Sequence, residues 1–391
     1  MEWIDLRSDT VTRPTPAMKD AMLSAKVGDD VFGEDESVNN LEKMAASMFG
    51  MEAGLFCPSG TMTNQIAIKM HTQPGDEVIC DELSHVYQYE GGGIAFNSGA
   101  SVRLLHGNRG RITAENVREG INGDDVHKPV SSLVVLENTS NRGGGCCYEM
   151  EDIKSIKRVC IDHGLTLHLD GARLFNALVE KKQRAVDYGH VFDSISICLS
   201  KGLGTPVGSV LLGTTQKIKK ARRLRKVFGG GMRQAGFIAA AGIYALEHHI
   251  DRLAVDHAHA KLIEAVLLSN PKVEMVLPVE TNIVIFRVKD GVNADQLVDQ
   301  LKEKGIPEDV FEASVKFGQE VGEAGALDSG FGDPSRTTIF DYAGVPAHQN
   351  WLNDGKFDGG KLTAEQKQLR EFYTKLMSLS ATEAVFNGAG T

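Results

Sequence analysis

The sequence lacks the features that mark nucleic-acid-binding proteins and membrane proteins. Its 42 lysines and arginines are outnumbered by 52 acidic residues, which gives a formal net charge of −10. Nucleic acids and anionic membranes attract basic surfaces, so we expect neither as a partner. The longest apolar run is GFIAAAGIYAL, residues 236–246, which is far short of the ~20 residues that a membrane-spanning helix needs. This run predicts a packed helix instead.

Export signals and metal-binding cysteine patterns are also missing. The first residues, MEWIDLRSDTVT, carry acids where a secretory signal would have a basic region and an apolar stretch. The six cysteines form no C-x-x-C pair and have no spacing to histidine that is typical of a metal site. We therefore expect a cytoplasmic protein with cysteines in its core and no zinc site.

The sequence does have the composition and the pattern of a large α/β protein. Hydrophobic residues make up 42% and charged residues 24% of 391 residues, which is enough chain for more than one domain. Short β-branched runs alternate with amphipathic segments, and this alternation predicts a mostly parallel sheet covered by helices. The clearest helix is EMEDIKSIKRVCIDHG, which ends at Gly164. Its predicted buried face consists of Ile153, Ile156, Val159 and Cys160.

Chemically active side chains follow the predicted strands AGLFC, DEVICDE, LTLHL and SISIC. Ligands of open α/β sheets bind at the carboxyl ends of strands, so these positions are the candidates for a site. The candidates are the turn Ser59-Gly60-Thr61, His85, Asp170 and Lys201. The turn opens a predicted helix, and the free amides at such a helix start are suited to a phosphate.

An amine, a carboxylate, an imidazole and a phosphate-binding turn together form the set that pyridoxal phosphate requires. We expect Lys201 to form a Schiff base, Asp170 to keep the pyridine nitrogen protonated and His85 to stack on the ring. Each residue taken alone also has a structural interpretation, as a loop lysine, a helix cap or a core histidine. A dinucleotide site is disfavoured, because GLGTPVG lacks the spacing of G-x-G-x-x-G.

Eight motifs carry a resemblance to a known family. They are DLRSDTVTRPTPAM, VGDDVFGED, PSGTMTNQ, HVYQYEGGG, LENTSNRGGG, HLDGARLFNA, ICLSKGLGTPVGS and GGGMRQAGFIAAAGIYAL. Over residues 1–305 the sequence resembles the low-specificity L-threonine aldolases, which are pyridoxal phosphate enzymes of fold type I. This resemblance implies a mostly parallel seven-stranded sheet flanked by helices, plus a smaller C-terminal α/β domain.

The resemblance also implies roles for individual residues. The implied catalytic residues are Lys201, His85 and Asp170, and Ser8, Tyr89 and Arg173 are the implied substrate-binding residues. The implied cofactor-binding residues are Ser59, Gly60, Thr61, His85, Asp170, Arg173, Ser200, Lys201 and Arg233, the last reaching the phosphate from a neighbouring subunit. Some relatives have a second active-site histidine where this chain has Ser140.

The domain organisation that the resemblance implies departs from the family near the C-terminus. We expect an N-terminal arm at 1–15, a large cofactor domain at 16–250, the start of a small domain at 251–305 and an atypical tail at 306–391. The family's small domain ends with a strand that carries an arginine for the substrate carboxylate, and we find no such strand. Residues 336–380 instead resemble a segment that follows the barrel of α-amylase-family glycoside hydrolases. Without the paired carboxylates of that barrel, no glycosidase activity is expected.

The activity that the resemblance implies is aldol cleavage of β-hydroxy-α-amino acids. L-Threonine and L-allo-threonine would give glycine and acetaldehyde, with His85 as the base that removes the β-hydroxyl proton. The family's enzymes are homotetramers built as dimers of dimers. Two alternatives stay open: a pyridoxal phosphate lyase that performs β-elimination, and a cofactor-binding chain whose replaced C-terminal segment impairs catalysis.

Overall fold

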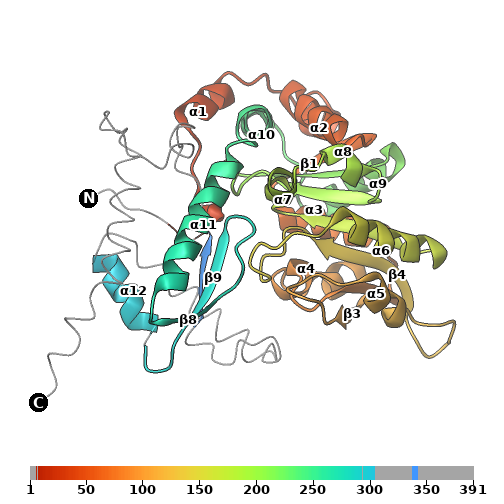
Figure 1. The fold of residues 1–391 in the computed structure, drawn as a ribbon. Coiled ribbons are helices and arrows are strands. Elements are labelled where there is room, and N and C mark those ends of the chain that lie inside the picture. The colour runs from red at the N-terminus through yellow and green to blue at the C-terminus, as the bar shows by residue number, and fades with distance from the viewer. Residues whose placement is uncertain (1–5, 7, 293, 304–336, 342–391) are drawn as a thin grey trace, which may run out of the picture. The chain divides into compact units, whose positions relative to one another are not determined.

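The computed structural model describes residues 6, 8–292, 294–303 and 337–341. By its internal contacts the chain divides into two units, one formed by Thr12–Leu253 and the other by Met1–Val11 with Ala254–Thr391. Figure 1 shows the elements of both.

The larger unit is built on a seven-stranded sheet with the strand order β1-β7-β6-β5-β4-β2-β3. Neighbouring strands run parallel from β6 to β3, whereas β7 runs antiparallel to both β1 and β6. The strands are β1 (Ala53–Cys57), β2 (Asp76–Asp81), β3 (Ser101–Leu105), β4 (Val130–Glu137), β5 (Thr166–Gly171), β6 (Ser194–Cys198) and β7 (Ser209–Gly213). The predicted mostly parallel sheet is therefore confirmed.

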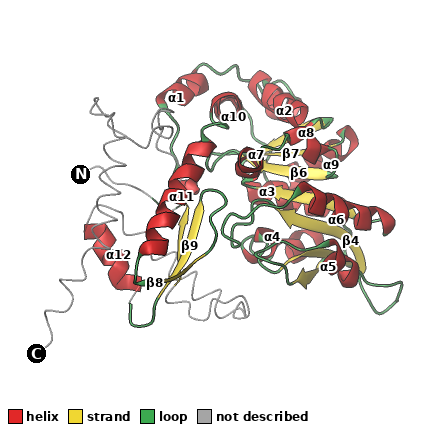
Figure 2. Cartoon of the chain, viewed as in Figure 1, coloured by secondary structure: helices red, strands yellow, loops and turns green. Residues whose placement is uncertain are grey.

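Helices flank the sheet of this unit, as the red and yellow segments of Figure 2 show. They begin with α1 (Pro16–Leu23), η2 (Asp30–Phe32), α2 (Glu36–Phe49), α3 (Gly60–His71), α4 (His85–Gln88), the short π-helix η3 (Ile94–Ser98) and α5 (Ala114–Gly120). They continue with α6 (Met150–Asp162), α7 (Leu174–Lys181), α8 (Ala185–Gly189), α9 (Thr215–Val227) and α10 (Gly236–His248).

The pleat of the strands divides the apolar side chains between the two faces of the sheet. In β4, Val134 and Leu136 pack in the core that includes residues of α2, α6, α7 and α10. Leu133 and Val135 alternate with them and pack against Ile68 of α3 in a separate cluster. Because successive side chains of a strand point to opposite faces, both layers of helices find an apolar surface.

Two helices predicted from the sequence form as expected. The predicted inward face of α6 is fully or almost fully buried, and Gly164 follows the helix with a φ of +70°. The run at 236–246 lies in α10, several of whose small residues are buried. Within the described part of the chain, no helix combines the length and the apolar character needed to cross a membrane. All six cysteines are buried and unpaired.

The smaller unit contains a second, antiparallel sheet with the order β10-β9-β8. Its elements are η1 (Asp9–Val11), α11 (Leu253–Ser269), which begins at the boundary of the units, β8 (Val273–Val276), β9 (Ile283–Val288), α12 (Ala294–Glu303) and β10 (Thr337–Asp341). Leu6 from the N-terminal segment packs in the core of this unit.

A third strand, β10, completes the sheet of the small unit, but its residues Thr337–Asp341 include no arginine, so the expected absence of the family's arginine-bearing strand stays a prediction. Thr337–Asp341 pairs with β9, and Thr337 lies opposite Arg287. Its apolar run is very short and far from β9 in the sequence, so periodicity gives almost no signal for it. Arg336 and most of the segment 336–380 lie outside the described residues.

The buried face of α6 leads to a stability prediction with a control on the same helix. Ile156 is fully buried, whereas Ile161 is 64% exposed. Ile156→Ala should lower the free energy of unfolding by ~2–5 kcal/mol, because it leaves a cavity in the core. Ile161→Ala should change it by only about 0.5 kcal/mol. Urea denaturation followed by circular dichroism measures both, and equal losses would contradict the packing of α6.

Candidate active site

The strand order brings the predicted site residues to one edge of the sheet. Asp170 lies near the end of β5, and Lys201 lies in the loop that follows β6. These two strands are parallel neighbours, and Asp170 pairs in register with Ser196 of β6. His85 begins α4 just after β2, and Ser59 stands between β1 and α3. All four belong to the larger unit.

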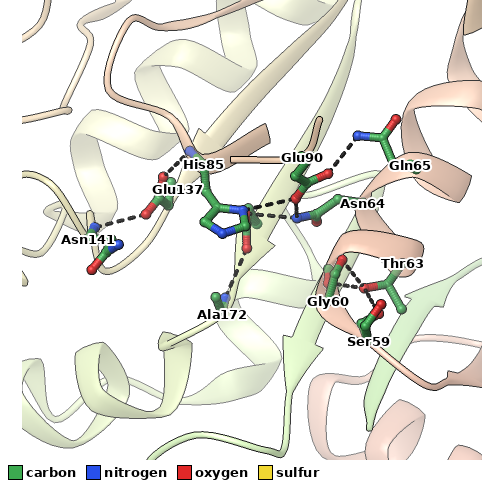
Figure 3. A network of polar contacts seen from close by, with 12 residues as sticks. Ser59, Gly60, Thr63, Asn64, Gln65, His85, Glu90, Glu137, Asn141 and Ala172 are labelled. Carbon is green, nitrogen blue, oxygen red and sulfur yellow. Dashed lines mark hydrogen bonds and ion pairs between the residues drawn. The ribbon is translucent and has the colours of Figure 1, made fainter. Parts of the chain in front are cut away.

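The buried amide of Asn64 joins two carboxylates at this edge, and Figure 3 shows its contact with Glu90. Asn64 Nδ2 donates to Asp170 Oδ2 and to Glu90 Oε1, in both cases at 2.8 Å. Gln65 Nε2 donates to the other oxygen of Glu90 at 2.6 Å. The ring of His85 completes the group. One ring nitrogen of His85 and one carboxylate oxygen each of Glu90 and Asp170 all lie within 4.8 Å of one another. The site therefore concentrates negative charge around one imidazole.

The position of His85 is fixed by two glutamates. Its ring nitrogen Nδ1 lies 3.0 Å from Glu90 Oε1, and its backbone amide donates to Glu137 Oε2 at 2.8 Å. Glu137 also accepts from the backbone amide of Asn141 at 2.8 Å. Because a carboxylate can only accept, the Nδ1 of a neutral His85 ring carries the proton and Nε2 is left as its basic nitrogen.

Burial and charge act in opposite directions on the titration of His85. Partial burial lowers the pKa of His85, but the hydrogen bond to Glu90 and the charges of Asp170 and Glu137 raise it more. The net result is a pKa above the usual value for histidine. Burial beside Asp170 also raises the pKa of Glu137, to about 6. The protonation of His85 and that of Glu137 thus each depend on the charge of the neighbouring groups.

The turn before α3 has the form of an anion site. Ser59 caps the helix by accepting from Met62 N at 3.2 Å, and Ser59 and Thr61 are exposed. A side chain at Gly60 would meet only the Ser209 hydroxyl, 3.6 Å away. That hydroxyl is buried and has no hydrogen-bond partner among the described residues. Open helix amides beside an unsatisfied hydroxyl are what a bound phosphate group would use.

Three other predicted residues lie in the same unit. The centroids of the Tyr89 and His85 rings are 5.6 Å apart. The guanidinium carbon of Arg142 lies over the Tyr89 ring, 4.3 Å from its centroid. Arg173 is almost completely buried, and its Nη1 donates to Asn141 Oδ1 at 3.3 Å. Ser200 is half-buried in the loop before Lys201.

Arg233 and Ser8 each have a polar partner other than the residues around His85. The exposed Arg233 side chain forms an ion pair with Asp29 at 2.8 Å. Ser8 belongs to the smaller unit, where its hydroxyl accepts from the Thr10 backbone amide at 3.2 Å. Ser140, at the position of the second histidine of some relatives, is buried and accepts from Gly143 N at 3.2 Å, within its own loop.

Three residues that hold His85 and Asp170 in place were not predicted from the sequence. Asn64, Glu90 and Glu137 all lie within the quoted motifs, but no role was assigned to them. A signal existed for Glu137, because it ends β4 and pairs in register with Asp170. The rule that selected Asp170 at the end of its strand therefore also selects Glu137.

Comparison with known proteins identifies the family. The model of the beta-eliminating lyase family matches residues 5–291. Low-specificity L-threonine aldolase 1 of Arabidopsis thaliana is 41% identical over 313 residues, which is 78% of this chain and 87% of that protein. The low specificity L-threonine aldolase of Escherichia coli strain K12 is 42% identical over 304 residues, 78% of this chain and 90% of the relative. The chain belongs to the low-specificity L-threonine aldolase family.

The fold agrees with this assignment. A solved threonine aldolase structure from Leishmania major superposes with a TM-score of 0.68 at 22% identity, over 76% of this chain and 87% of that one. At this identity the likeness concerns the fold alone. The family match ends before the C-terminal tail, and the comparisons give no support to the amylase-like resemblance of residues 336–380.

The carboxylate of Glu90 should control the titration of His85. Glu90→Gln removes a negative charge 3.0 Å from Nδ1, so the pKa of His85 should fall. Glu82→Gln is the matched control, because Glu82 contacts the ring of His106 instead. NMR titration of the histidine ring signals, with His85→Asn for assignment, measures the pKa in each protein. A pKa of His85 that is the same with and without the Glu90 carboxylate would contradict this account.

Proposed function

We propose that this chain is a pyridoxal phosphate-dependent aldolase that cleaves L-threonine and L-allo-threonine to glycine and acetaldehyde. The observation that carries the proposal is the group of His85, Glu90 and Asp170 at the carboxyl edge of the sheet, in a chain of this family. We further propose a cytoplasmic homotetramer built as a dimer of dimers, as the sequence resemblance implies.

The residues present fit pyridoxal phosphate. The buried acids Asp170 and Glu90 favour a cationic group beside them, as a protonated pyridine nitrogen would be. The turn at Gly60, with the unsatisfied hydroxyl of Ser209 beside it, favours a phosphate. Lys201 supplies an amine at the neighbouring strand end. The cationic and anionic ends of one ligand are thus each matched by a different part of the sheet edge.

Each of these residues has a defined task in the proposal. Asp170 would hold the pyridine nitrogen, Lys201 would carry the cofactor through Nζ, and the turn at 59–61 would hold the phosphate. When bound, the cofactor supplies an electron-accepting ring for the electron pair released as the Cα–Cβ bond breaks. Ser200 stands beside Lys201 and is proposed as a further contact of the cofactor. Arg233 is proposed to reach the phosphate of a neighbouring subunit after leaving Asp29.

The chain's own contribution to bond cleavage is the removal of the β-hydroxyl proton. His85 would accept this proton at Nε2, because Glu90 keeps the proton of the neutral ring on Nδ1. The positive charge that forms on the ring is stabilised by Glu90, Asp170 and Glu137. Since Ser140 is used in its own loop, we assign the base to His85 alone.

Substrate orientation is assigned to the cations and hydroxyls of the predicted binding set. Arg173 would bind the substrate carboxylate, since its guanidinium is buried and directed by Asn141. Asn141 is in turn held through its backbone by Glu137, so the carboxylate-binding arginine and the base share one support. Tyr89, beside His85, is proposed to contact the substrate side chain. Ser8 is proposed as a second contact of the carboxylate.

Cofactor attachment gives the first test of the proposal. The purified protein should bind pyridoxal phosphate with a visible absorbance, and borohydride reduction should fix the cofactor to the peptide that contains Lys201. Peptide mapping by mass spectrometry identifies the labelled residue. Lys201→Ala should lose both the label and the turnover of L-threonine while keeping its circular dichroism spectrum. A label on any other lysine would refute the assignment.

The role of His85 gives the second test. His85→Asn should lower kcat for L-threonine cleavage by ~10²–10⁴, which is the usual range for loss of a general base. His106→Asn serves as the control, because His106 is exposed and contacts Glu82 rather than the site. Steady-state rates of acetaldehyde formation measure both variants. If His85→Asn keeps the kcat of the unaltered enzyme, His85 is not the base.

A further inference from the structure

A chain of hydrogen bonds leads from the end of α3 into the active site. His71 Nε2 lies 2.8 Å from Ser194 Oγ, and this hydroxyl lies 2.8 Å from His168 Nδ1. The other nitrogen of His168, Nε2, lies 3.2 Å from Asn64 Oδ1. His168 and Ser194 are fully buried, and Asn64 is 2% exposed. Within the described part of the protein, Asn64 is the member of this series that hydrogen-bonds to the acids of the site, and the other three lie behind it.

The donor and the acceptor of each hydrogen bond in this series follow from the orientation of the Asn64 amide at its inner end. The Asn64 amide group faces two carboxylates, so its Nδ2 must point toward them and its carbonyl toward His168. A carbonyl can only accept, and His168 Nε2 therefore carries a proton. Burial lowers the pKa of His168 to about 4, so the ring is neutral and Nδ1 is an acceptor. The Ser194 hydroxyl must then donate to Nδ1.

A competing acceptor shows why the Ser194 hydroxyl matters. The backbone carbonyl of Ser194 lies 3.1 Å from His168 Nδ1, where it would accept a proton carried by that nitrogen. In that tautomer His168 Nε2 would be an acceptor facing the Asn64 carbonyl, and the two would repel each other. The hydroxyl prevents this by occupying Nδ1 as a donor. The same hydroxyl oxygen can accept a hydrogen bond from His71 Nε2. Burial lowers the pKa of His71 to about 3, so the His71 ring is neutral.

We propose that His168, in the tautomer that has its proton on Nε2 and accepts from Ser194 at Nδ1, is a positioning residue that holds the Asn64 amide toward Asp170 and Glu90. This inference rests on the proposed function, in which Asp170 binds the cofactor and Glu90 supports the base. If the Asn64 amide were to turn over, its carbonyl would face both carboxylates. This single rotation would remove the donor to Asp170 and also the donor to Glu90, the carboxylate that orients His85.

The first arm of the test measures pyridoxal phosphate affinity of the cofactor-free full chain. His168→Leu removes the donor to Asn64, and the dissociation constant should rise by ~10-fold or more, since hydrogen bonds to charged groups are strong. His168→Gln should recover most of this loss, because its terminal amide can donate in place of Nε2. His163→Leu is the control, on an exposed histidine outside the site. Equal affinities for His168→Leu and the unaltered chain would overturn the proposal.

A double-mutant cycle separates positioning from packing. If His168 acts through Asn64, His168→Leu should have no further effect on cofactor affinity in an Asn64→Ala background. Additive losses would show that His168 acts by filling space, and would overturn the proposal. Ser194→Ala removes only the hydroxyl that contacts His168 Nδ1 and keeps both His168 and Asn64. This variant replaces His168→Leu in the test if His168→Leu fails to fold. It should raise the dissociation constant in the same direction.

The second arm needs no cofactor, so it decides the inference even if the proposed function fails. Ring ¹⁵N shifts of histidine-labelled protein report which nitrogen of His168 carries the proton. The expected result is protonated Nε2 and bare Nδ1, with Ser194→Ala shifting the proton toward Nδ1. A proton on Nδ1 in the unaltered chain would overturn the proposal. Failure of the unaltered protein to bind pyridoxal phosphate would instead refute the proposed function.

Discussion

The sharing of one amide by two buried carboxylates is the constraint on which the candidate site depends. Asp170 and Glu90 each accept from Asn64 at 2.8 Å, and both are almost completely removed from water. Like charges so close in a buried place are costly unless donors and positive groups balance them. The raised pKa of His85 is one consequence, because the ring gains stability by being protonated there. A demand for positive charge also makes this edge suitable for a protonated pyridine ring.

The parallel sheet makes this concentration of acids possible. Parallel neighbours bring their carboxyl ends to one edge, so Glu137 of β4 and Asp170 of β5 stand side by side in register. The loop after β4 then brings Asn141 to Arg173, while α3 supplies Asn64 from the side of the sheet. The ends of a few strands therefore position His85 as the proposed base, the residues that support it and the proposed carboxylate-binding arginine. A change in any one of them is expected to reach the others.

The sequence predicted the scaffold better than the interactions within the site. Apolar runs predicted the strands β1, β2, β5 and β6, and the end-of-strand rule selected His85, Asp170 and Lys201. Asn64 gave no such signal, because it is a polar residue inside a helix. Its role follows from the two carboxylates and the histidine that it contacts in the folded chain. The ion pair of Arg233 with Asp29 and the strand β10 join segments far apart in sequence, so local patterns could not reveal them.

Product analysis tests the central claim most directly. The full chain, reconstituted with pyridoxal phosphate, is incubated separately with L-threonine and L-allo-threonine, and glycine, acetaldehyde, ammonia and 2-oxobutyrate are quantified. Aldol cleavage predicts glycine and acetaldehyde in equal molar amounts. Ammonia and 2-oxobutyrate in their place would mean that the same residues direct β-elimination, and that result would contradict the account.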